Sequence, residues 1–161
     1  MPLPFDTPQL HLHLSNNVHN LLRLPANEDV PTPLRDWLTR DLWTTSTADT
    51  FVSITRTQHE ISIVTDLSLP TDMTDLGVSA ETCTVSAFAS IKVQGPLAHH
   101  LTGILSAMTI PLKNAQVPIF ALSTSDTDYV LVPLTKASEA KKALTDDGWT
   151  VINSESELWK A

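Results

Sequence analysis

The chain has 161 residues, of which 42% are hydrophobic, which is enough to bury a core in one domain or in two small ones. Its formal net charge is −8, and its Lys and Arg residues are scattered, so a nucleic-acid backbone would meet net repulsion. The single cysteine, Cys83, cannot form an internal disulfide, and the N-terminal residues lack the basic flank and apolar run of a signal peptide or a membrane span. These features predict a cytoplasmic protein that binds neither nucleic acid nor membranes.

The first elements along the chain are predicted to be a short hairpin and a helix. Three alternating leucines, Leu10, Leu12 and Leu14, indicate a strand, and 18–24 is expected to pair with it across the polar residues 15–17. A loop follows over 27–33. The next apolar positions recur at helical spacing and predict the buried face of a helix, formed by Leu34, Trp37, Leu38 and Leu42.

A second hairpin is predicted after this helix. Residues 51–56 and 61–66 have the composition of strands, and they flank the polar residues 57–60. The following segment, 67–82, contains a proline, a glycine and several acidic residues, which is typical of a connection. The sequence therefore predicts a degenerate N-terminal module over 1–66, joined by a linker at 67–82 to a C-terminal module over 83–161.

The C-terminal module begins with a clear change of period. Apolar and polar residues alternate over 85–93, which predicts a half-buried strand that ends at Gly95-Pro96. From Leu97 to Leu112 the apolar residues recur at helical spacing, and Pro111 is expected to end that helix.

Two strands, a helix and a final strand complete the module. A hairpin is predicted from 117–123 and 127–132, with 124–126 as its turn. A helix then opens near Pro133 and stops at Gly148, and 149–153 supplies the last strand. The order strand, helix, strand, strand, helix, strand predicts an α+β fold of ferredoxin-like βαββαβ modules, each an antiparallel sheet with helices on one face.

Five segments of the chain carry a resemblance to a known family, namely 51–57, 60–64, 93–97, 103–105 and 119–132. They resemble the short tandem ACT-domain proteins related to the CASTOR-type arginine sensors, and the resemblance covers nearly the whole chain. It implies tandem ACT modules, side-by-side pairing into a homodimer, and a cleft between modules that binds a small molecule, with an amino acid as the expected ligand. One departure is Ser125, which stands where such relatives commonly carry an aromatic residue and therefore marks an altered or absent pocket.

The resemblance and the residue types together give a set of candidate ligand-binding residues. Gly103 lacks a β-carbon, so a charged ligand group can approach the backbone, and the amides at the helix start can bind a carboxylate. Asp128, by its alignment with the sensors, would receive a cationic group, and hydroxyls of the hairpin at 51–66 could add donors. The full set is Gly103, Ile104, Asp126, Thr127 and Asp128, with Ser53, Thr55 and Ser62.

Each candidate also has a structural alternative. Gly103 could serve close helix–sheet packing, and the carboxylate of Asp126 could bond the amides of its own turn. Asp128 stands at a strand position, which turn chemistry does not explain. The hydroxyl residues Ser53, Thr55 and Ser62 are also ordinary members of strands.

Metal binding and catalysis have little support in the sequence. His11 and His13 share a strand face and His99 lies beside His100, but neither pair has a Cys or an acidic residue at ligand spacing, so no metal or cofactor is expected. No Gly-x-Ser-x-Gly motif or phosphate-binding glycine loop occurs, and Cys83 has no nearby histidine in sequence.

Two hypotheses about function follow. In the first, the chain is a regulatory or sensor protein that binds an amino acid without catalysis, and the ligand stabilises one arrangement of the modules and thereby a surface for a protein partner. In the second, it is a small metabolic enzyme that uses Asp128 or Glu60 as a general base in the same cleft. An enzyme would convert the bound ligand to a product, whereas a regulator would bind it without converting it.

Overall fold

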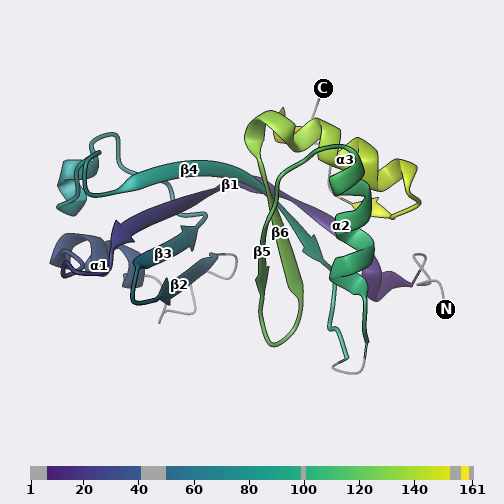
Figure 1. The fold of residues 1–161 in the computed structure, drawn as a ribbon, viewed down its shortest axis with the longest axis horizontal. Coiled ribbons are helices and arrows are strands. Elements are labelled where there is room, and N and C mark those ends of the chain that lie inside the picture. Colours follow the sequence, from purple (N-terminus) through teal and green to yellow (C-terminus); the bar gives the residue numbers. More distant parts are fainter. Residues whose placement is uncertain (1–6, 41–49, 99–100, 153–156, 160–161) are drawn as a thin grey trace. The chain divides into compact units, whose positions relative to one another are not determined.

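The computed structural model describes residues 7–40, 50–98, 101–152 and 157–159. Its contacts divide the chain into two compact units (Figure 1). Unit 1 comprises Met1–Val18 and Phe88–Ala161, and unit 2 comprises His19–Ala87. These units do not coincide with the segments 1–66, 67–82 and 83–161, because the divisions fall inside two long strands, β1 (Leu12–Pro25) and β4 (Thr84–Val93).

Unit 2 is built on the strand order β2-β3-β1-β4. The second half of β1 pairs antiparallel with β3 (Glu60–Thr65), which in turn pairs antiparallel with β2 (Val52–Arg56). The helix α1 (Thr32–Thr39) follows β1, and the 3-10 helix η2 (Met73–Leu76) precedes β4. The order along the chain and across the sheet is that of a ferredoxin-like module in which η2 takes the place of the second helix.

Unit 1 has the same order of strands and helices along the chain, with longer helices. The second half of β4 pairs with β6 (Asp128–Pro133), and β6 pairs with β5 (Phe120–Ser123), both antiparallel. The start of β1 lies next to β4 and pairs in parallel with the short strand β7 (Val151–Ile152). The helical elements of the unit are η1 (Pro8–Leu10), α2 (Ile104–Asn114), η3 (Leu134–Lys136), α3 (Ala137–Asp146) and η4 (Glu157–Trp159). The α+β, ferredoxin-like fold class predicted from the sequence is confirmed.

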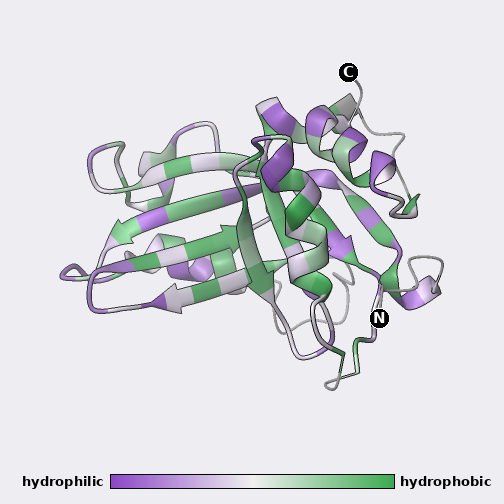
Figure 2. Ribbon diagram, turned by 45° about the vertical axis from the view of Figure 1, so that its right-hand side comes forward, coloured by the Kyte–Doolittle hydropathy of each residue, from purple (hydrophilic) through white to green (hydrophobic). Residues whose placement is uncertain are grey.

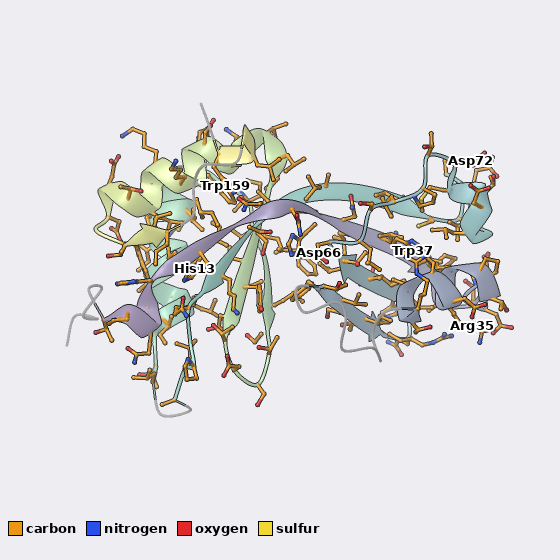
Figure 3. All side chains as sticks on the ribbon, turned by 180° about the vertical axis from the view of Figure 1, so that it is seen from behind. His13, Arg35, Trp37, Asp66, Asp72 and Trp159 are labelled. Carbon is orange, nitrogen blue, oxygen red and sulfur yellow. The ribbon has the colours of Figure 1, made fainter. Side chains whose placement is uncertain are left out.

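Each unit has its own apolar core. Hydrophobic and hydrophilic residues are interspersed along the strands, as Figure 2 shows, and in β1 the leucines Leu12, Leu14, Leu22 and Leu24 are buried. Trp159, at the end of the described chain, is 1% exposed, and its Nε1 donates a hydrogen bond to the carbonyl oxygen of Ser15 at 2.9 Å (Figure 3). The core of unit 1 includes Leu12, Ile91, Met108, Val130, Leu144 and Trp159, and that of unit 2 includes Leu22, Leu34, Ile61 and Ile63.

The predicted first hairpin is wrong, because β1 continues through residues 15–17 without reversing. The Ser15 hydroxyl bonds to the amide of Asn17 at 3.0 Å and to its carbonyl at 3.3 Å. Because the Ser15 hydroxyl bonds to nearby backbone, the polar residues 15–17 are compatible with an extended chain. They also include no glycine, which would favour the left-handed turn of a tight hairpin.

The predicted limits of the first C-terminal helix also need correction. The helix α2 begins at Ile104, not at Leu97, and it continues beyond Pro111 to Asn114. Pro111 lacks the amide that would bond to Ala107, but its ring is buried, and the carbonyl of Pro111 accepts a bond from Ala115 at 3.0 Å. One hydrogen bond is lost there without ending the helix. The predicted helix position Leu42 lies outside the described residues.

The end of η2 depends on a glycine in close contact with the loop before α1. Gly77 has a φ of 73°, and a β-carbon added there would lie 2.9 Å from the Cβ atom of Pro31. The residue must therefore be glycine both for its left-handed backbone and for the space that it leaves.

Replacing Gly77 with alanine should lower the free energy of unfolding by about 2 to 4 kcal/mol, since left-handed strain adds to overpacking. Gly103 is a matched control, because its φ is 83° but nothing lies within 4 Å of its added β-carbon. Gly103→Ala should therefore cost only about 1 to 2 kcal/mol. Urea denaturation measures both, and equal losses would contradict the steric account.

Candidate ligand-binding cleft

A cleft of about 270 Å³ lies in unit 1 between two connecting segments. One wall comes from described residues of 97–105, which join β4 to α2, and the other comes from the turn between β5 and β6 and its flanks at 124–128. The structure therefore brings five candidate residues to one place, namely Gly103, Ile104, Asp126, Thr127 and Asp128.

Two contacts hold these walls together. The buried Thr127 hydroxyl donates a hydrogen bond to the carbonyl of Val93 at 2.5 Å, and the Leu97 amide donates to the carbonyl of Asp126 at 2.9 Å. Gly95 permits the close approach of the turn to the segment after β4, since a β-carbon added to Gly95 would lie 3.1 Å from the Asp126 carbonyl oxygen and 3.2 Å from the Thr127 Cβ atom. The Thr127 hydroxyl is thus engaged within the protein, and it anchors the turn to the end of β4.

The turn itself is stabilised by Thr124. Its Oγ1 accepts hydrogen bonds from the amides of Asp126 at 3.3 Å and Thr127 at 3.1 Å, and its own amide donates to the Thr127 carbonyl at 2.8 Å. The structural alternative for Asp126 is that its carboxylate bonds the amides of the turn, and the Thr124 hydroxyl forms those bonds instead. That carboxylate is exposed and has no hydrogen bond or ion pair in the described part of the chain.

Asp128 provides a second carboxylate in the cleft. It is half-buried and stands opposite Ser123 in the β5–β6 register, where the Ser123 hydroxyl donates to its Oδ1 at 2.6 Å. No lysine or arginine is found among the described lining residues. Within the described part of the chain, two carboxylates thus line the cleft without a neighbouring Lys or Arg, which favours a ligand group that carries positive charge.

In the opposite wall, amides at the start of α2 have no acceptor among the described residues. Gly103 is the N-cap of α2 and has no side chain to cap it, and the first bond within the helix runs from the Ala107 amide to the Gly103 carbonyl at 2.8 Å. The amides of Ile104 and Leu105 therefore have no acceptor within the helix, and a helix N-terminus favours negative charge. Because the space around Gly103 is open, the packing alternative for this glycine does not hold.

The remaining three candidates lie in unit 2 and do not line this cleft. Ser53 and Thr55 are on β2, and Ser62 stands opposite Thr55 on β3. The Ser62 hydroxyl donates to Glu60 Oε1 at 2.9 Å.

Glu60 also forms an ion pair at the end of β3. Its Oε2 lies 2.5 Å from the Nε atom of Arg23. The hydrogen bonds from Arg23 and, next, from Ser62 lower the pKa of the Glu60 carboxyl below its ordinary value. A lowered pKa makes Glu60 a weaker base.

Sequence reasoning missed several residues of this site. Leu97 and Leu101 were assigned to a helix, yet they lie before α2 and form part of the cleft wall. Thr124 was read only as part of a polar turn. The spacing between Gly95-Pro96 and Gly103 is the available signal, because residues that favour irregular backbone bracket the six residues 97–102.

No group of three His, Cys, Asp or Glu side chains that could hold a metal ion occurs among the described residues. His99 and His100 lie outside them. None of the described helices has the length and hydropathy needed to span a bilayer.

Comparison with known proteins gives an ACT-domain match for part of the chain. Residues 84–146, which include the cleft, match a family model described as ACT domain. A protein of Agobacterium tumefaciens of known structure is 28% identical, with a TM-score of 0.63, over 88% of this chain and 91% of its own. Among curated proteins nothing matches.

Two aspartate kinase structures share the fold at lower identity. The ligand-free regulatory subunit from Thermus thermophilus is 12% identical, with a TM-score of 0.52, over 85% of this chain and 96% of its own. The Clostridium acetobutylicum aspartate kinase is 11% identical, with a TM-score of 0.53, over 81% of this chain and 33% of its own. The family model supports an ACT domain over 84–146, and these likenesses show the fold; neither shows the arginine-sensor specificity.

The anchor between Thr127 and Val93 can be tested by stability. Thr127→Val keeps the shape of the side chain but removes the hydroxyl, and it should lower the free energy of unfolding by about 1 to 3 kcal/mol. Thr102→Val, in an exposed position of the same unit, should change it by less than about 0.5 kcal/mol. Denaturant unfolding measures both variants, and a Thr127→Val protein as stable as the wild type would rule out the anchor.

Proposed function

We propose that the cleft binds a free amino acid and that the protein is a non-catalytic regulator or sensor. The observation that carries this proposal is that one wall of the cleft favours a negatively charged group and the other favours a positively charged group. The amides of Ile104 and Leu105 suit a carboxylate, and Asp126 and Asp128 suit an ammonium group. A free α-amino acid carries both groups on one carbon.

The size of the cleft and the comparisons support the same class of ligand. At about 270 Å³ the cleft is at the lower end of ligand pockets, which typically begin near 300 Å³, so it suits a small molecule. The ACT-domain match includes both walls, and the neighbours of similar fold include a regulatory subunit and an enzyme described as allosteric.

Within this class, cationic amino acids are the first to be tested. The α-ammonium group neutralises one carboxylate, which leaves the other to pair with a positively charged side chain. Arginine fits this charge requirement and also agrees with the resemblance to CASTOR-type sensors.

We further propose that the protein is cytoplasmic and forms a homodimer. The edge strand β5 would provide backbone groups for this association.

The enzymatic alternative is not favoured. Glu60 lies in unit 2, its carboxylate is bonded to Arg23, and its lowered pKa makes it a poor general base. Asp128 remains as the candidate base in the cleft. Mass spectrometry of the ligand after incubation decides between the two functions, since a regulator returns it unchanged.

The proposal predicts ligand-dependent thermal stabilisation. In a panel of free amino acids, one member at a hundred times its dissociation constant should add about 2.7 kcal/mol, which raises the melting temperature by about 5 to 10 °C. Its N-acetyl derivative and its carboxamide should have no effect, because each lacks one of the two charged groups. A flat response to the whole panel would contradict the proposal.

A matched pair of variants connects the effect to the cleft. Asp128→Asn should abolish the shift and leave the unliganded protein folded, since it removes the charge but keeps the size. Asp147→Asn removes an exposed carboxylate at the end of α3, in the same unit but outside the cleft, and should bind as the wild type does. Normal binding by Asp128→Asn would exclude Asp128 from the site.

A further inference from the structure

The Asp128 carboxylate has a fixed partner on the neighbouring strand. Ser123 and Asp128 are the last residues paired between β5 and β6 before the turn, so their side chains are cross-strand neighbours. The bond from the Ser123 hydroxyl to Oδ1 is 2.6 Å long, which is the range of a charge-assisted hydrogen bond. Ser123 is exposed and is not among the residues that line the cleft.

We propose that Ser123 is a positioning residue, which orients the Asp128 carboxylate for the ammonium group of the ligand. This inference rests on the proposed amino-acid site. The bond occupies Oδ1 alone, and Oδ2 has no hydrogen bond in the described part of the chain, so one oxygen is held by the protein and the other is available to the ligand.

The physical effect is a restriction of side-chain rotation. A half-buried aspartate can occupy three staggered χ1 wells, and a bond across the strand pair selects one of them before the ligand arrives. A site organised in this way avoids the cost of ordering the carboxylate on binding. Water can replace the lost hydrogen bond at Oδ1 when Ser123 is changed, so the orientation is the main quantity that the hydroxyl contributes.

The positioning role can be separated from the structure of the turn. The Thr124 hydroxyl bonds to the amides of Asp126 and Thr127, and Thr127 anchors the turn to Val93. None of these bonds involves Ser123. Removal of its hydroxyl therefore leaves the geometry of the turn intact.

The test combines ligand affinity with the rotamer of Asp128. Ser123→Ala should weaken binding of the amino acid found in the panel by about threefold, because three wells become accessible in place of one. The couplings between the α- and β-protons of Asp128, measured by NMR in the free protein, should change from those of a single rotamer to averaged values. Ser123→Thr keeps the hydroxyl and should restore both properties, and Ser138→Ala, on α3, should alter neither.

The possible outcomes distinguish this inference from the proposed function. If Ser123→Ala binds as tightly as the wild type, or binds less tightly while Asp128 keeps a single rotamer, the positioning role is overturned and the amino-acid site stands. If the wild-type protein binds no amino acid, the site and the positioning role fall together. Weaker binding with averaged couplings, reversed by Ser123→Thr, supports the inference.

Discussion

The candidate site depends on the hydrogen bond between the Thr127 hydroxyl and the carbonyl of Val93. This bond connects the end of β4 to the β5–β6 turn, residues that are 34 positions apart in the sequence. Gly95 allows the connection, because a β-carbon there would meet the carbonyl of Asp126 and the side chain of Thr127. One wall of the cleft begins at Leu97, two residues after Gly95, and the other contains Thr127, so this contact and the bond from the Leu97 amide to Asp126 hold the two walls together.

Unit 2 differs from unit 1 near the start of its first helix. Near the start of α1 the structure has a cavity of only about 80 Å³, and Gly77 lies against Pro31. Pro33, within the first turn of α1, also lacks an amide that could bind an anion. By contrast, α2 begins at a glycine with open space around it. The two units share an order of strands and helices along the chain, and Glu28 and Asp29 line the cavity of unit 2, but the cleft of unit 1 is larger and the first turn of α2 has no proline.

The sequence predicted elements well where one periodicity ran without interruption. The alternation over 85–93 and the turn at 124–126 led to β4 and to the β5–β6 hairpin. Alternation does not show whether a chain reverses, so β1 was divided into two strands at Ser15. Apolar spacing likewise does not show where a helix begins, so Leu97 was placed in α2 although it lies before it.

The candidate site was predictable in part. The family resemblance indicated Gly103 and Asp128, which line one cleft. Thr127 was among the predicted residues, but its anchoring bond to Val93 and the bond from Ser123 to Asp128 were not predictable, because hydrogen bonds between residues distant along the chain or on different strands leave no local pattern. The hydroxyls of the hairpin formed by β2 and β3 match the expected residue type, but they belong to unit 2 and do not line the cleft.

An NMR titration of the amide protons with the stabilising amino acid tests the central claim most directly. If the carboxylate binds at the start of α2 and the ammonium group at the turn, the largest shift changes will occur at Ile104, Leu105 and residues 126–128, with little change in unit 2. The N-acetylated ligand should leave all these signals unmoved. Saturable binding whose shift changes lie outside this cleft would contradict the account.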